Sequence, residues 1–225
     1  MKEKVAIVLA HPDDAELRCY GTICKYLNEG KECILLIASS GEHGISVREE
    51  QGKNILLDKK LREEETLLAF EGLHISFRFL HQKDGYMQYG RDLIHAIESE
   101  LVEIQPDIII THYPDAYGTD HQDHTAIGKA VLNCSARINS VKKILLCEPL
   151  KAVRSRFVPN YFVDITDYFD KKMRALKCQK SQGGRFYLEE DFHKTKGLFY
   201  AANLSYEQAH NEHFFEAYEL YICYE

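Results

Sequence analysis

Short apolar runs alternate with amphipathic segments along the first two thirds of the chain. The centre of each run is apolar throughout, as in strands buried on both faces of a parallel sheet, and the runs cover 5–10, 32–41, 107–112 and 143–148. A further strand is predicted at 74–80 from its alternating pattern, and apolar residues at helical spacing predict helices at 14–29, 61–70, 91–104 and 124–138. The resulting β-α-β-α-β-α-β-α-β order indicates a three-layer, doubly wound, Rossmann-like α/β fold. Its sheet is expected to be mostly parallel, with helices on both faces.

The pattern is less regular from about 150 to 225. A strand is predicted at 161–165 and a helix at 167–182, and the sequence SYEQ from Ser205 is a capping box that opens a terminal helix. Residues 219–224 are predicted to form an edge strand. Because neither a repeat nor a domain boundary is evident, we interpret 1–225 as one domain with a C-terminal extension.

Composition restricts the class of protein. The chain has 225 residues, of which 45% are hydrophobic, so it can bury a sizeable core. A formal net charge of −7 argues against nucleic acid or an anionic membrane as the main partner. No apolar run approaches the roughly 20 residues that span a bilayer, and the first residues do not resemble a signal peptide. The seven cysteines include no C-x-x-C pair, so we expect reduced thiols and a cytoplasmic location.

The segment VLAHPDDAEL, residues 8–17, places a histidine and two adjacent aspartates directly after the first strand. One interpretation is a helix start, since Asp13 and Glu16 form a D-x-x-E capping pattern. That interpretation does not explain two neighbouring carboxylates beside His11. A divalent cation would offset their repulsion, so a metal site is the alternative.

A second polar cluster favours the metal interpretation. The segment GTDHQDHTAIG, 118–128, follows the fourth strand and precedes a helix, although a polar turn would also account for it. The commonest doubly wound order places the first strand beside the fourth, and ligands bind at the carboxyl ends of the strands there. The two clusters are therefore expected to face each other.

The residue types then suggest the chemistry. Two histidines and one carboxylate, here His11, His124 and Asp14, form the ligand set of a catalytic zinc site that keeps a position open for water. Iron(II) accepts the same set. Asp13 would remain free as a general base for a water of lowered pKa.

These residues also resemble a known family. AHPDDAEL together with DHQDH is similar to the LmbE-like, or PIG-L, family of zinc-dependent N-acetylglucosaminyl deacetylases. Four further segments resemble that family, and they are SSGEHG, LREEETLLAF, FLHQKDG and VDITDYFDKKMRALKCQKSQ. The resemblance extends from residue 4 to about 182.

The resemblance implies hydrolysis of an N-acetyl or other N-acyl group on a small-molecule amino sugar or its conjugate. Carried over by position, the zinc ligands are His11, Asp14 and His124. The implied catalytic residues are Asp13 as general base, His121 at the carbonyl oxygen or the leaving amine, and Asp123 as an orienting residue. Arg62 and Asp84 match positions that contact the sugar, although a surface helix residue and a turn former are the alternatives.

Some features depart from the family or leave the function open. The family's glycine-rich segment after the first motif is RCYGTI here, so Arg18, Cys19 and Tyr20 are expected to narrow the pocket or contact an acidic group. A zinc amidohydrolase acting on a non-sugar amide and a non-catalytic ligand-binding domain are the alternative functions. Residues 42–60 are predicted to form a mobile loop or a solvated face. His112 is predicted to shape the loop in which it lies. The protein is expected to form a homo-oligomer.

Overall fold

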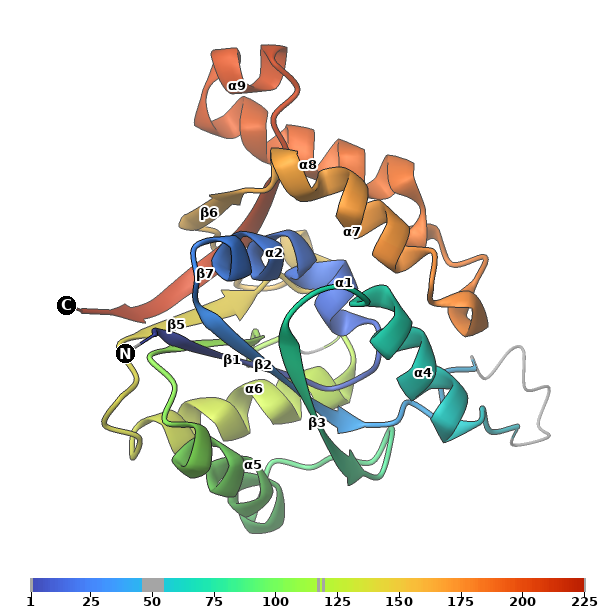
Figure 1. Ribbon diagram of the computed structural model, residues 1–225, viewed down its shortest axis with the longest axis vertical. Coiled ribbons are helices and arrows are strands. Elements are labelled where there is room, and N and C mark those ends of the chain that lie inside the picture. The colour runs from blue at the N-terminus through green and yellow to red at the C-terminus, as the bar shows by residue number, and fades with distance from the viewer. Residues whose placement is uncertain (1, 46–54, 117, 119, 225) are drawn as a thin grey trace.

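The computed structural model describes residues 2–45, 55–116, 118 and 120–224, so part of the predicted 42–60 segment lies outside the described residues. Within this part, one seven-stranded sheet has the order β3-β2-β1-β4-β5-β7-β6 (Figure 1). The strands are β1 (Lys4–Leu9), β2 (Glu32–Ser39), β3 (Ile75–Gln82), β4 (Ile108–His112), β5 (Lys143–Cys147), β6 (Tyr161–Asp164) and β7 (Phe215–Cys223). The first five strands pair in parallel, whereas β7 is antiparallel to both of its neighbours. The predicted α/β fold is confirmed, including β1 beside β4.

Helices cover both faces of the sheet (Figure 1). They are α1 (Asp14–Arg18), α2 (Tyr20–Asn28), α4 (Lys59–Ala69), α5 (Arg91–Ile104), α6 (Gln122–Ser135), α7 (Phe169–Leu176), α8 (Glu190–Leu204) and α9 (Tyr206–His210). Alternate β1 side chains enter two separate cores: Val5 and Ile7 pack in the core that contains α2 and α7, and Ala6 and Val8 pack in the core of α5 and α6. This alternation explains why the strand is apolar throughout.

Three predictions about the elements were wrong in detail. The single helix expected at 14–29 is two helices with a break at Cys19. The helix expected at 167–182 ends at Leu176 and is followed by a separate 3₁₀ turn, Lys180–Gln182. The final strand does not lie at the edge, because β7 pairs with both β5 and β6. Helix α8 was not predicted. The predicted helix start at Ser205 is confirmed, since its Oγ accepts from the Gln208 backbone N–H, but the return bond of a capping box is not formed, because the Ser205 N–H donates to Ala201 instead.

Two further features concern the whole chain. In the described residues, no helix is long and apolar enough to cross a membrane. All seven cysteines are free thiols, and five of them are buried, as expected for small core residues.

Candidate functional site

The loops after β1 and β4 meet at the carboxyl edge of the sheet, where the strand order reverses. His11 lies in the first loop, Asp14 begins α1, and His124 lies in the first turn of α6. His11 Nδ1 is 3.0 Å from His124 Nε2, and Asp14 lies 3.2 Å from His124 Nε2 and 3.5 Å from His11 Nδ1. Zinc bonds of ~2.0–2.1 Å in tetrahedral geometry separate ligand atoms by about 3.3–3.4 Å. Asp14 directs a different oxygen to each histidine, Oδ1 to His124 and Oδ2 to His11, and the spacing of the three side chains is close to that of ligands of one ion.

Carboxylates behind the two imidazoles leave their lone pairs directed at this point. His124 Nδ1 is 2.8 Å from Asp120 Oδ1, and His11 Nε2 is 3.0 Å from Asp84 Oδ1. A carboxylate accepts only, and these contacts are shorter than those of the two rings to Asp14, so they favour the neutral tautomer with the proton on His11 Nε2 and on His124 Nδ1. The opposite nitrogens, His11 Nδ1 and His124 Nε2, then present lone pairs to each other beside Asp14. Such a group of acceptors could hold a cation.

The pKa values of His11 and His124 are both raised, so the surrounding carboxylates favour positive charge at this point. Burial lowers the pKa of His11, but hydrogen bonds with Asp123, Asp14 and Asp84 outweigh burial and raise it well above the usual value. The pKa of His124 is also raised, because Asp14 and Asp120 outweigh the effect of burial. In the absence of an ion, protons would take its place.

Asp13 lies beside these groups in a strained conformation. It is 8% exposed and has φ 145°, which non-glycine residues rarely adopt. Its side chain does not cap α1, so the helix-start interpretation fails for this residue. Instead, its Oδ2 lies 3.1 Å from a terminal nitrogen of Arg62. Burial raises the pKa of Asp13, and Arg62 opposes that shift.

Arg62 is buried rather than a surface helix residue. Besides Asp13, it donates to the carbonyl oxygens of Pro12 at 2.6 Å and Gly41 at 2.9 Å. It lines the cleft, and its contacts hold the loop that carries Asp13 against the loop after β2. Arg62 therefore positions Asp13, whatever it also contacts in a substrate.

His121 caps the N-terminus of α6, and this contact fixes its tautomer. The backbone N–H of Asp123 donates to His121 Nδ1 at 3.2 Å, so the neutral ring carries its proton on Nε2. Burial and the neighbouring His11 and His124 lower the pKa of His121 to about 4. Its ring stands edge-on to His11 with centroids 4.8 Å apart. His121 is thus a neutral N–H donor at the mouth of the centre.

Asp84 and Asp123 both lie behind His11. Asp84 lines the cleft and accepts from the backbone N–H of His43 at 2.7 Å, which, with the His11 contact, makes it more than a turn former. Asp123 is fully buried, lies 3.4 Å from His11 Nε2 and accepts from the backbone N–H groups of Gly85 and Met87. Both carboxylates orient His11.

Two residues contribute in ways that the sequence did not reveal. Asp120, which orients His124, was part of the predicted cluster without a role of its own. Arg18 contacts two carboxylates of the site itself, Asp120 and Asp14. The departure from the family's glycine-rich pattern was the signal for Arg18. No comparable signal distinguishes Asp120 from the other aspartates of the cluster.

His112 packs against two of the candidate metal ligands. Its ring stacks on His124 with centroids 4.1 Å apart and planes 7° apart, and its Nε2 accepts from the Ala10 backbone N–H at 3.0 Å. Its Nε2 also lies 3.3 Å from Asp14. These contacts agree with the predicted role of shaping the loop.

The candidate residues open onto a cleft of about 590 Å³, a volume typical of small-molecule sites. His11, Asp13, Asp14, His121 and His124 all line it. The chain therefore brings together in one accessible space a group of side chains that could hold a cation, the carboxylate of Asp13 and a neutral N–H donor.

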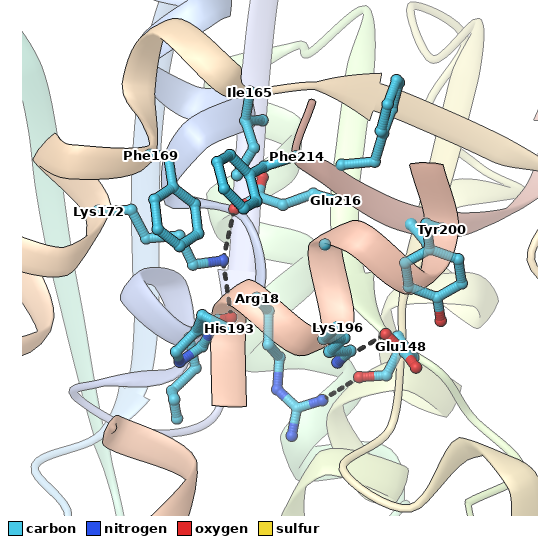
Figure 2. A pocket seen from close by; sticks show the side chains of 14 residues that line it. Arg18, Glu148, Ile165, Phe169, Lys172, His193, Lys196, Tyr200, Phe214 and Glu216 are labelled. Carbon is cyan, nitrogen blue, oxygen red and sulfur yellow. Dashed lines mark hydrogen bonds and ion pairs between the residues drawn. The ribbon is translucent and has the colours of Figure 1, made fainter. Parts of the chain in front are cut away.

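A smaller cavity of about 30 Å³ lies behind α1, among α7, α8 and β7 (Figure 2). Its wall contains a buried ion pair in which Lys172 Nζ lies 2.7 Å from Glu216 Oε1. Lys172 also donates to the carbonyl oxygen of Leu17 at the end of α1, and Glu216 accepts from the backbone N–H groups of Gly21 and Thr22 at the start of α2. The pair thus places positive charge at the C-terminus of one helix and negative charge at the N-terminus of the next, where each is favourable.

The chain is similar to several known proteins. The chain is 26% identical to diacetylchitobiose deacetylase of Thermococcus kodakarensis, over 98% of this chain and 86% of that relative. It is 28% identical to a probable N-acetyl-alpha-D-glucosaminyl L-malate deacetylase 2 of Bacillus subtilis, over 81% and 84% of the two chains. The solved 4-carboxy-2-hydroxymuconate hydratase of Pseudomonas putida has the same fold, with a TM-score of 0.81, 21% identity and coverage of 99% and 98%. Residues 6–135 match the family described as PIG-L, GlcNAc-PI de-N-acetylase, and the chain belongs to this family.

Proposed function

We propose that this protein is a metal-dependent N-deacetylase that removes an acetyl or other acyl group from an amino sugar or an amino-sugar conjugate. The observation that carries the proposal is the convergence of two imidazole lone pairs and a carboxylate beside the unligated Asp13. The names of the two deacetylase relatives support the substrate class.

His11, Asp14 and His124 would hold the metal, and zinc or iron(II) suits two nitrogens and one oxygen. When bound, such an ion supplies Lewis acidity, which lowers the pKa of a water towards 7 and polarises an amide oxygen. Every remaining part of the reaction falls to residues of the chain itself.

Asp13 accepts the proton of the attacking water. Its carboxylate lines the cleft, and the contact with Arg62 fixes its direction. His121 Nε2–H donates to the oxygen on which charge develops, a contribution typically worth about 3–4 kcal/mol for one preorganised donor. The nitrogen leaves as a neutral amine, and Asp13, protonated in the first step, returns that proton.

The test compares Asp13→Asn with the unchanged protein on N-acetylglucosamine conjugates, with acetate and free amine as readouts. We expect turnover to fall by about 10²–10⁴-fold, because a general base is lost, while the metal content stays near one ion per chain. Asn keeps the size of the side chain, so a folding defect is not expected. Equal turnover in the variant contradicts the role of Asp13.

The assay also separates the proposed activity from the alternatives. Non-sugar amides form a second set of substrates, and an unsaturated hydroxy acid tests the water addition that the solved hydratase is named for. Turnover of either of these, with every acetylated sugar left intact, refutes the proposed substrate class.

A further inference from the structure

Arg18 is a charged side chain of the cleft that the proposed reaction does not use. It ends α1, and its side chain is only 9% exposed. Its Nε lies 3.3 Å from Asp14 Oδ1, and one terminal nitrogen donates to both oxygens of Asp120 at 2.9 and 3.1 Å. The other terminal nitrogen donates to the main-chain oxygen of Glu148. The guanidinium points away from the Lys172–Glu216 pair (Figure 2).

Arg18 therefore contacts both a candidate metal ligand and a carboxylate that contacts another ligand. Asp14 is a ligand, and Asp120 is the carboxylate behind the ligand His124. The same terminal nitrogen of Arg18 is also 3.1 Å from His124 Nδ1. A guanidinium stays charged at every pH at which the protein is folded, so this positive charge is permanent.

We propose that Arg18 is a positioning residue that sets the charge of the metal centre: by neutralising Asp120 and sharing Asp14, it weakens divalent-cation binding and leaves the bound ion a stronger Lewis acid. The inference rests on the metal centre of the proposed function.

The contacts of the two carboxylates indicate that charge, rather than scaffolding, is the main effect. Asp120 Oδ1 also accepts from the His121 backbone N–H at 3.0 Å and contacts His124 Nδ1, so Asp120 is held without Arg18. Asp14 Oδ2 accepts from the His11 backbone N–H at 2.8 Å. Removal of Arg18 thus leaves the ligands in place while the nearby negative charge becomes uncompensated.

The experiment measures the zinc affinity of metal-free protein by competition with a chromophoric chelator, at fixed pH and salt. Arg18→Met removes the charge but keeps the length of the side chain, and Arg18→Lys keeps the charge. We expect Arg18→Met to bind zinc about tenfold more tightly or better, because charges a few ångströms apart in a mostly buried site interact strongly. Arg18→Lys should stay within about threefold of the unchanged protein, since its charge is retained.

Lys151→Met is the matched control, because Lys151 lines the same cleft but is exposed to solvent that screens its charge. Its zinc affinity should be unchanged. The shift in thermal midpoint on zinc addition provides a second readout, and it should be larger for Arg18→Met than for the unchanged protein.

Zinc affinity that is equal or weaker in Arg18→Met overturns the proposal, as does an equal gain in Lys151→Met. If Arg18→Met does not fold, Arg18→Gln replaces it with the same expectation. The measurement contains no substrate, so a protein that binds zinc but cleaves no acetylated sugar refutes the proposed function alone. A protein that binds no zinc refutes both.

Discussion

The Lys172–Glu216 pair offers a direct test of what holds the break between α1 and α2. Lys172→Met removes the ammonium and retains an unbranched apolar chain of similar length. Glu216 then remains 5% exposed, still bonded to Gly21 and Thr22, but without its counter-charge. We expect the free energy of unfolding to fall by about 3–5 kcal/mol, the usual cost when one partner of a buried pair is removed.

The measurement is urea unfolding of metal-free protein, with the slope checked for two-state behaviour. Lys194→Met is the matched control, since Lys194 and Glu190 also approach to 2.7 Å but their side chains are 47% and 41% exposed. No measurable change is expected there, because solvent screens an exposed pair. The double variant Lys172→Met, Glu216→Gln should recover at least half of the loss, since no buried charge is left unpaired. A loss below about 1 kcal/mol in Lys172→Met refutes the reasoning, because surface pairs cost that little.

Three further predictions follow from local geometry. In urea unfolding, Asp13→Gly should have a free energy of unfolding about 1 kcal/mol higher than Asp13→Ala, because both variants lack the carboxylate and only glycine tolerates φ 145° without strain. Equal free energies of unfolding would contradict that strain. Gly128→Ala should destabilise the protein by about 1–3 kcal/mol, because the added Cβ would clash with the main-chain oxygen of His112, although alanine favours helices. A thermal midpoint at or above that of the unchanged protein would contradict this close approach. Asp120→Ala should weaken zinc binding about 10–100-fold in chelator competition through the loss of its contact with His124, and unaltered affinity would exclude that orienting role.

The sheet and the meeting of the two motifs were predictable because they depend on local patterns and one topological rule. The apolar runs identified the buried strands, and the position of β1 beside β4 brought His11 to His124. The break at Cys19 was not predictable, because the apolar spacing of 14–29 continues through it. The groups that stabilise the break, Lys172 and Glu216, come from the other end of the chain.

Helix α8 was missed for a different reason. Its buried positions include His193 and Gly197, which do not look like a core-facing stripe. Gly197 packs closely against Phe214, since a Cβ there would lie 3.0 Å from the Phe214 ring. The role of Asp120 was equally hidden, because the backbone path of the loop before α6 decides which carboxylate of DHQDH faces which imidazole. Sequence spacing does not fix that path.

The insertion of β7 between β5 and β6 has a consequence for synthesis on the ribosome. Gly21 and the Glu216 carboxylate that caps its helix are 195 positions apart, so the start of α2 lacks this cap until nearly all of the described chain has been translated. A nascent chain that already displays both histidine loops therefore still lacks the counter-charge at the break between α1 and α2. That break is completed only when β7 enters the sheet.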